Sequence, residues 1–430
     1  MSTITKISAR EVLDSRGDPT VEVEVQCQEG VGCAIVPAGA STGSAEAYEL
    51  RDGDPERYEG RGVLQAVRNV EEVIAPAMVG MDAADQISID ARLCELDPSP
   101  RKTRLGGNAM LGVSLAAAHA AAAAQHLPLY QHINRLWQSL LSPPGAAMQP
   151  RIPLPMTNMI SGGAHAGGNI DFQDFLIMPV GAGSFAKALE WIVRVSRKLG
   201  GLLKDAGYEG RLVGDEGGYG PRLKNNRQAA EFVVRAIEAA RLRPGEDVTL
   251  AIDVASTQFY DGEHYRLSAT GGARLSSAQM VQELEEMVDE FPITSIEDGL
   301  AEEDWDGWQL LTERLGSRVK LIGDDLFATR EDRVRRGVAL RAANGVLIKC
   351  NQVGTLSETM RTMRLAYVSN YNRVVSARSG ESEDTTIADL AVGTMTKIIK
   401  IGSIQRSERL AKYNRLLRIE EELGEDRINW

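Results

Sequence analysis

Three acidic residues each follow a short apolar run in the second half of the sequence. They are Asp253, Glu297 and Asp324, after the runs 249–252, 293–296 and 319–323. If these runs are neighbouring parallel strands, the three carboxylates face one mouth and repel one another unless a cation lies between them. Side chains that offer only oxygen select a hard ion, magnesium before zinc. The alternative is that each acid caps a helix or pairs with a surface lysine, but three acids in register favour a metal site.

Basic residues follow the next apolar runs. Lys349 follows 346–348, and a lysine beside a bound dication loses its proton more easily, which suits a general base. A structural salt bridge to Asp324 is the alternative for this lysine. Lys400 follows the last run and could hold an anion, while Arg378 and Ser379 offer the fork and hydroxyl that suit a phosphate.

A general acid would have to face this base. Glu216 lies in the glycine-flanked acidic loop 214–219, which taken alone could be only a turn. His165 lies in the glycine-rich loop 161–168 and could reach a substrate when loops close. Ser41 lies in the small-residue loop 38–43, which could fold over a metal or phosphate, although such a loop is a weak signal by itself.

The elements that would position these residues alternate between short apolar strands and amphipathic helices. An example is the helix expected over 277–291, where Met280, Leu284 and Met287 form one apolar stripe. Such a repeat predicts a parallel α/β sheet, and charged residues at successive strand ends favour a barrel, whose active sites lie at that face. The sequence has no GxGxxG after a strand and no GxxxxGK[ST], which argues against a nucleotide-binding open sheet.

The N-terminal part has a different pattern. Strands are expected over 4–12, 20–26 and 32–36, and helices over 62–78 and 108–125, the second an alanine-rich core helix. A linker is expected over 140–149. We therefore predict an N-terminal α+β capping domain over 1–140 and a catalytic barrel over 147–430.

Composition excludes several classes of function. The chain has 430 residues, 43% hydrophobic and 25% charged, with a net charge of −12 and no long basic run, so nucleic acid and anionic membrane are not expected partners. No run of roughly 18 apolar residues predicts a membrane span. The polar N-terminus lacks a signal-peptide pattern, and the four cysteines have no CxxC spacing, which together favour reduced thiols in a cytoplasmic protein.

Over essentially its whole length the sequence resembles enolase, the phosphopyruvate hydratase family. The stretches that carry the resemblance are 14–19 (DSRGDP), 39–43 (GASTG), 214–219 (GDEGGY), 295–299 (SIEDG), 323–327 (GDDLF), 347–352 (LIKCNQ), 378–383 (RSGESE) and 407–421 (SERLAKYNRLLRIEE).

The resemblance implies a fold and a set of roles. It implies an α/β protein with an enolase-type (β/α)8 barrel that begins with an antiparallel strand, a smaller N-terminal α+β domain, and a homodimer or higher homo-oligomer. It implies a lyase that uses two magnesium ions per site and a metal-stabilised enolate of a small phosphorylated or phosphonylated acid. By matching position, the magnesium ligands are Asp253, Glu297, Asp324 and, for the second ion, Ser41; the catalytic residues are Lys349 as base, Glu216 as acid and Asp174; the substrate ligands are His165, Gln173, Arg378, Ser379 and Lys400.

Four positions depart from the family pattern. The family has Glu at Asp174, His at Ala377, Asn at Ser161 and Ser at Ala38. The first two changes shorten or remove side chains where the hydroxyl group leaves, and both would enlarge that side of the cavity. Several changes at once are hard to attribute to drift in an ordinary hydratase.

These departures leave three hypotheses. The one we favour is a diverged paralogue that binds a 2-phosphoglycerate- or phosphoenolpyruvate-like acid and uses the enlarged side for a group bulkier than water; carboxyphosphonoenolpyruvate synthases of phosphinic-acid natural-product pathways are similar. The second is ordinary enolase of glycolysis. The third is a catalytically weak binding protein that keeps the fold, against which the retained Lys349 and Glu216 count.

Overall fold

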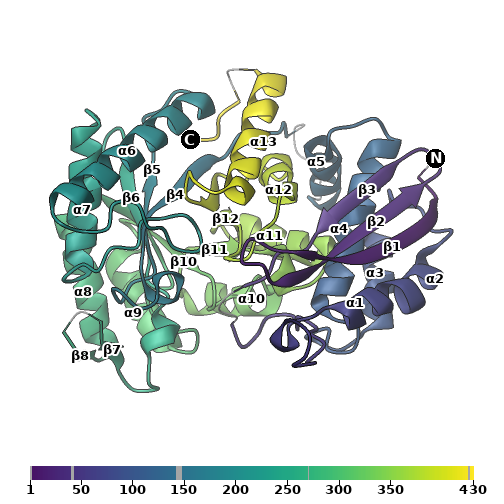
Figure 1. The fold of residues 1–430 in the computed structure, drawn as a ribbon, viewed down its shortest axis with the longest axis horizontal. Helices are drawn as coiled ribbons and strands as arrows, with labels where there is room; N and C mark the ends of the chain where they lie inside the picture. The colour runs from purple at the N-terminus through teal and green to yellow at the C-terminus, as the bar shows by residue number, and fades with distance from the viewer. Residues whose placement is uncertain (1, 40–42, 142–147, 270, 425–426) are drawn as a thin grey trace.

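The computed structural model describes residues 2–39, 43–141, 148–269, 271–424 and 427–430. The chain begins with an antiparallel sheet in the order β1 (Ile4–Leu13), β2 (Pro19–Cys27), β3 (Val31–Ile35), so the three predicted strands are confirmed (Figure 1). In β2 the valines are buried while Glu22 and Glu24 are partly exposed, as alternation along a half-buried strand requires.

Helices pack against one face of this sheet. The predicted helix 62–78 is present as α1 (Leu64–Arg68), a π-helical turn over Asn69–Ile74, and α2 (Ala75–Met78). The predicted alanine-rich helix is α4 (Gly107–Ala124), which packs on β2 and β3. The sequence analysis did not predict α3 (Gln86–Leu96) or α5 (Leu129–Leu140). Of the predicted linker, residues 142–147 lie outside the described residues, and the domain boundary there stays a prediction.

Helix α4 is a core helix. Contrary to the expectation from sequence, it is long and apolar enough to cross a membrane, with a mean hydropathy of 1.2. However, 83% of it is buried inside the protein, which is the environment of the central helix in a globular domain. Close contacts explain its small residues: a Cβ added at Gly32 of β3 would lie 2.1 Å from the backbone nitrogen of Ala120.

The second part of the chain is a closed barrel of eight strands, which confirms the predicted fold class. Its strands in chain order are β4 (Leu154–Ser161), β5 (Asp174–Met178), β6 (Thr249–Asp253), β9 (Ile293–Glu297), β10 (Lys320–Gly323), β11 (Gly345–Ile348), β12 (Asn372–Ser376) and β13 (Ile398–Gly402). Strand β5 is antiparallel to both β4 and β6, whereas the other neighbouring pairs are parallel. The expectation that the barrel begins with the antiparallel strand is therefore wrong by one position, since β5 is the second strand.

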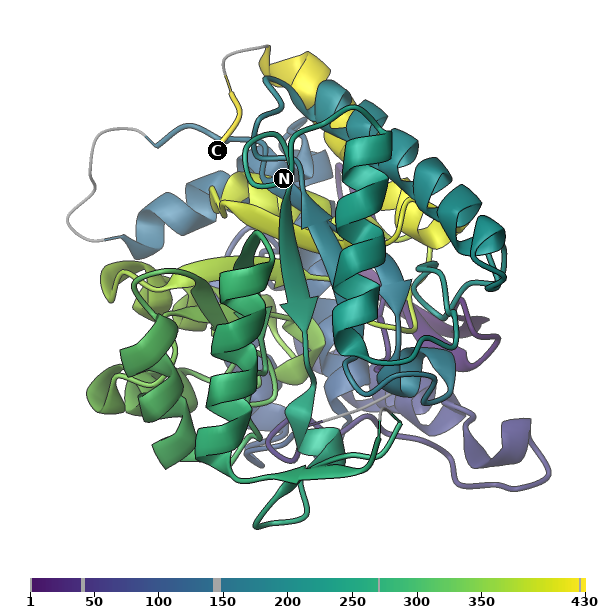
Figure 2. The same cartoon turned by 90° about the vertical axis from the view of Figure 1, so that its left-hand side faces the viewer.

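Helices surround the barrel on its outside (Figures 1 and 2). They are α6 (Phe185–Asp205), α7 (Asn226–Ala239), α8 (Ser277–Glu290), α9 (Trp305–Leu315), α10 (Glu331–Leu340), α11 (Leu356–Val368), α12 (Thr386–Gly393) and α13 (Ser407–Leu423). A small hairpin of β7 (Tyr265–Leu267) and β8 (Ala273–Leu275) precedes α8. The apolar stripe predicted on α8 is buried, as expected for a core-facing helix.

An apolar cluster fills the inside of the barrel. Its members are Leu154, Met156, Leu176, Met178, Ala251, Ile322, Leu347, Val374 and Ile398. Because side chains alternate across a strand, the residue two positions further toward the mouth also points inward. Those positions are occupied by polar or charged residues in several strands, among them Asp253 after Ala251 and Lys349 after Leu347. The strand period therefore places these polar and charged side chains at the mouth, directly above the apolar cluster.

Candidate active site

Two carboxylates at the barrel mouth share one ammonium group. Asp253 ends β6 and Glu297 ends the neighbouring strand β9. Lys400 Nζ lies 2.7 Å from Asp253 Oδ2 and 2.8 Å from each oxygen of Glu297, and all three side chains are buried. Lys400 lies inside β13 rather than after it, because the strand continues to Gly402, so the predicted end of that strand is corrected.

A second ion pair lies beside the first. Lys349 follows β11 and its ammonium pairs with Oδ2 of Asp324, which follows β10. Gln352 Nε2 donates to Asp324 Oδ1 at 2.9 Å, so both oxygens of this carboxylate are engaged. Burial lowers the pKa of Lys349, but the surrounding negative charges, Asp324 first and then Glu297, together raise it to above the usual value. The fall in pKa expected next to a dication therefore stays a prediction.

The mouth holds more negative charge than its two lysines balance. Asp298 and Asp325, next in sequence to Glu297 and Asp324, bring further carboxylates, and oxygens of Asp298, Asp324 and Asp325 lie within 4.8 Å of one another. Burial and the charge of Asp253 raise the pKa of Glu297, and burial and Asp324 raise that of Asp325 to about 7. A buried oxygen-only donor set with surplus negative charge fits a hard divalent cation.

Sequence reasoning missed Asp298 and Asp325. Asp298 accepts hydrogen bonds from the backbone nitrogens of Asp324 at 2.9 Å and of Asp325 at 2.8 Å, so it fixes the loop that carries them. The signal was available, because a second acid directly follows the assigned one in both SIEDG and GDDLF. Single acids were assigned to strand ends, and their neighbours were passed over.

The opposite side of the cavity is formed by His165, Asp174 and Glu216. His165 Nδ1 lies 3.0 Å from Asp174 Oδ2, and the amide of Asn158 donates to the other oxygen of Asp174. Burial lowers the pKa of His165, but Asp174 and Glu216 raise it to about 9. Burial raises the pKa of Glu216, but the nearby cations, His165 first and then Arg409 and the two lysines, together lower it to below the usual value. A pKa of about 9 favours the protonated form of His165 at neutral pH, and the role of Glu216 as the acid stays a prediction.

The loop that carries Glu216 packs tightly on the end of β4. A Cβ added at Gly218 would lie 2.6 Å from Asn158 Oδ1 and 2.7 Å from Ser161 Oγ. One at Gly214 would lie 2.5 Å from the backbone oxygen of His165. Glycines are required here because the backbone itself makes the contact, and the contact aims Glu216 into the cavity.

The anion side involves the N-terminal domain. Arg378 is buried, and its Nη1 lies 2.8 Å from Glu46 Oε2 and 3.0 Å from Asn351 Oδ1. The guanidinium group of Arg378, which was predicted to hold a phosphate, is therefore paired with the carboxylate of Glu46 in the other domain. Sequence reasoning missed this partner. Ser379 is buried beside Arg378 in the same cavity. Ser41 lies outside the described residues.

The remaining predicted residues lie close by. Gln173 Nε2 donates to Asp253 Oδ2 at 3.1 Å, which connects the metal side with the strand that carries Asp174. One cavity is lined by Lys349 and Lys400 together with Glu216, His165 and Ala377. The structure thus brings the described candidates together at one barrel mouth.

The four departures from the family pattern occupy different places. Ala377 lines the cavity with only a methyl group. Asp174 is fully buried, with both oxygens engaged by Asn158 and His165. Ser161 is buried under the Glu216 loop. Ala38 is buried and pairs through its backbone with Gly380.

Comparison with protein families matches nearly the whole chain. The model of the enolase N-terminal domain matches residues 4–133, and the model of the enolase C-terminal TIM barrel domain matches residues 149–429. The two matches correspond to the antiparallel sheet with its helices and to the closed barrel.

Proposed function

The chain belongs to the enolase family, and from this premise we propose that it is a magnesium-dependent enzyme acting on a small phosphorylated acid of the 2-phosphoglycerate or phosphoenolpyruvate kind. One observation carries the proposal. Two ammonium groups, the half-buried one of Lys349 and the buried one of Lys400, lie among carboxylates at neighbouring strand ends and share one cavity with His165. A base and a proton source on opposite sides of one small cavity suit proton removal at one carbon and assisted departure from the next.

Magnesium would be held by Asp253, Glu297 and Asp324, and a second ion by Ser41. When bound, it supplies positive charge beside the substrate carboxylate, where negative charge grows as the neighbouring carbon loses its proton. The oxygen-only donor set and the surplus negative charge at the mouth support this assignment.

The chain's own residues divide the remaining work. Lys349 Nζ takes the proton from the carbon next to the carboxylate. Lys400 holds the substrate carboxylate by its ammonium group, and Arg378 with Ser379 holds the phosphate. His165, oriented by Asp174, and Glu216 protonate the group that leaves from the opposite side.

We favour a diverged paralogue over an ordinary hydratase. The support is local: Ala377 offers a methyl group where the family has an imidazole, and the shortened Asp174 has both oxygens engaged. The leaving-group side is therefore altered while the base side is intact, which suits a partner group bulkier than water, as in carboxyphosphonoenolpyruvate synthases. Ordinary enolase is the second candidate, because His165 and Glu216 still line the cavity that holds Lys349.

Two measurements on one sample separate these functions. Purified protein with magnesium and 2-phosphoglycerate in D2O is followed by NMR for loss of the proton next to the carboxylate and by absorbance for the enol product. Exchange with slow or no product supports the paralogue, and exchange with rapid product identifies ordinary enolase. Absence of exchange in wild type would overturn the proposal, and Lys349→Ala is the control that must abolish exchange.

We further propose that the enzyme works in the cytoplasm as a homodimer or larger homo-oligomer. The support is the family membership and the acidic composition without a basic run. Light scattering of the purified protein tests the assembly, and a monomer at micromolar concentration would contradict it.

A further inference from the structure

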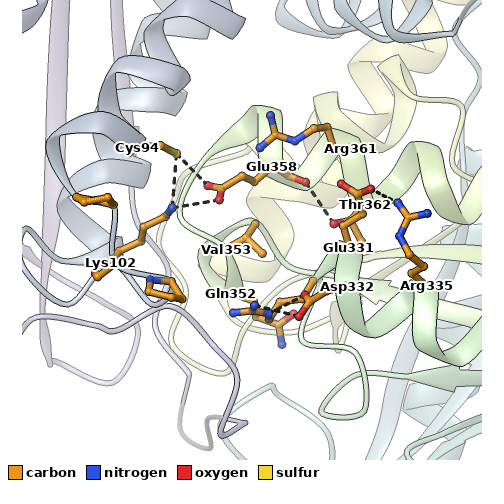
Figure 3. A pocket seen from close by; sticks show the side chains of 14 residues that line it. Cys94, Lys102, Glu331, Asp332, Arg335, Gln352, Val353, Glu358, Arg361 and Thr362 are labelled. Carbon is orange, nitrogen blue, oxygen red and sulfur yellow. Dashed lines mark hydrogen bonds and ion pairs between the residues drawn. The ribbon is translucent and has the colours of Figure 1, made fainter.

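A separate cavity lies between the N-terminal domain and the barrel. Its volume is about 720 Å3, and its walls come from α3 and the loop after it on one side and from α10 and α11 on the other (Figure 3). Three side chains meet in its wall: Cys94 of α3, Lys102 of the following loop, and Glu358 of α11.

These three side chains form a triangle of contacts. Lys102 Nζ lies 3.5 Å from Cys94 Sγ and 3.1 Å from Glu358 Oε1, and Cys94 Sγ lies 3.7 Å from Glu358 Oε2. Lys102 is buried and Cys94 is half-buried, yet both line the cavity, so a small oxidant can reach the sulfur. Within the described part of the chain, Cys94 is the one cysteine that contacts an amine.

We propose that Cys94 and Lys102 form an oxidant-dependent modification site in which a covalent sulfur–nitrogen bond links the two side chains. In the first step a peroxide oxidises the thiol: Cys94–SH and H2O2 give Cys94–SOH and water. In the second step the neutral amine attacks the sulfur: an N–H and the S–O bond break, the S–N bond forms, and water leaves. The peroxide is the only oxidant required, and the link contains two hydrogens fewer than the separate side chains.

Glu358 is placed to move the protons in both steps. Its two oxygens contact the thiol and the ammonium separately, so it can accept a proton from either group. Burial and the charge of Glu358 raise the pKa of the Cys94 thiol. The thiol therefore stays protonated at neutral pH until a base takes its proton, and the link should form slowly compared with reactions of free thiolates.

The link would alter contact between the domains. Lys102 would lose the ammonium charge that pairs with Glu358 across the interface. Gln352 lines the same cavity and donates to Asp324 at the barrel mouth. The loss of the Lys102 charge would therefore occur in a cavity that shares one lining residue with the hydrogen-bond network of the active site. The inference does not depend on which acid the enzyme uses.

Peptide mass spectrometry tests the link directly. The protein is treated with hydrogen peroxide, digested with trypsin, and searched for peptides 93–101 and 102–104 joined with the loss of two hydrogens. We expect this species in wild type, its disappearance after dithiothreitol, and its absence in Cys94→Ser and Lys102→Arg. Lys102→Arg keeps the positive charge toward Glu358, so it separates loss of the nucleophile from loss of the ion pair.

Two further variants refine the test. Cys33→Ser removes an exposed thiol elsewhere and should leave the link unchanged. Glu358→Gln keeps the shape but not the base and should slow the reaction several-fold. Oxidation of Cys94 to sulfinic acid with Lys102 free, or an unmodified Cys94 while Cys33 is oxidised, would overturn the proposal.

Discussion

Asp253, Asp324, Lys349 and Lys400 each lie two residues beyond an apolar side chain of the barrel interior, so the strand period sets their direction. Glu297 ends a neighbouring strand at the same mouth. Glu297 shows that this placement carries an electrostatic penalty. It is buried beside Asp253, and burial together with that neighbouring charge raises its pKa, so the group is held in an environment that disfavours its ionised form. A bound cation would offset this unfavourable free energy, which explains why the two carboxylates lie together here.

The variant Glu297→Gln tests this interpretation. It removes one charge from the crowded mouth, and we expect magnesium affinity to fall by about 100-fold or more, since even changes behind the ligands cost about 10- to 100-fold. Stability without metal should not fall, because Asp253 still pairs with Lys400. Calorimetric titration with magnesium and thermal unfolding in EDTA measure the two effects, and the control is Glu313→Gln at an exposed position of α9. Unchanged magnesium affinity would contradict the metal site.

Restoring the family residues tests the altered side of the cavity. In the double variant Ala377→His, Asp174→Glu, we expect dehydration of 2-phosphoglycerate to rise by about 100-fold, the lower range for a positioned acid or base. Because Asp174 is fully buried, the longer side chain can strain the site by about 1–3 kcal/mol, so folding is checked by thermal unfolding. Ala377→Gln fills space without a titrating ring. An equal gain in that variant, or no gain in the double variant, would show that these positions do not explain the difference.

At this scale the sequence predicted the placement of residues at the barrel mouth better than their contacts. The three acids and Lys349 could be assigned because each follows an apolar run. Asp298 could have been found from the same motifs. The pairing of His165 with Asp174 could not, since the two lie on different segments whose approach depends on β4 and β5 being antiparallel.

Among the elements, α5 carries a buried histidine that makes the fold sensitive to acid. His132 is buried, and burial lowers its pKa from 6.5 to about 4. The unfolded chain therefore binds more protons than the folded one between these values, so stability falls as pH decreases from about 6.5 to about 4 and does not change above that window. The shift corresponds to roughly 3 kcal/mol.

The variant His132→Phe should remove this part of the pH dependence. Urea unfolding at pH 7 and pH 5 gives the loss of free energy for each protein, and we expect a smaller loss in the variant than in wild type. His264→Gln changes a partly exposed histidine and should leave the loss unchanged. Equal losses in wild type and His132→Phe would show that other groups cause the acid sensitivity.

The elements also show where local patterns are insufficient. Strands that end in charge were predicted almost to the residue, since an apolar run and a polar stop are both local signals. The direction of β5 cannot be predicted from local sequence, because the apolar pattern is the same for a parallel and an antiparallel strand. Only the pairing of β5 with β4 and β6 defines its direction. Helices α3 and α5 were missed, and Lys400 was placed after β13 because Ile401 was not counted with the strand.

For the whole molecule, the contact between Glu46 and Arg378 matters most. The two residues are 332 positions apart and belong to different domains, yet they form a buried ion pair in the active-site wall. No sequence signal connects them, because each lies in a loop and their meeting depends on how the N-terminal domain docks on the barrel. The sequence therefore predicts a barrel site to which the N-terminal domain adds only Ser41, whereas the structure shows that Glu46 of that domain also forms part of the site wall.

The variant Glu46→Gln tests whether this pair holds the place of a substrate phosphate. It keeps the size of the side chain but removes the carboxylate charge that pairs with the buried guanidinium of Arg378, and breaking a buried ion pair typically costs about 3–5 kcal/mol. If a phosphate group takes the position opposite Arg378, phosphoenolpyruvate with magnesium should stabilise the variant more than wild type, because the ligand then supplies the missing charge. Urea unfolding with and without ligand measures both effects, and Glu95→Gln at an exposed site should show neither. A loss in Glu46→Gln that the ligand does not reduce more than in wild type would place the phosphate elsewhere and would confine Arg378 to joining the two domains.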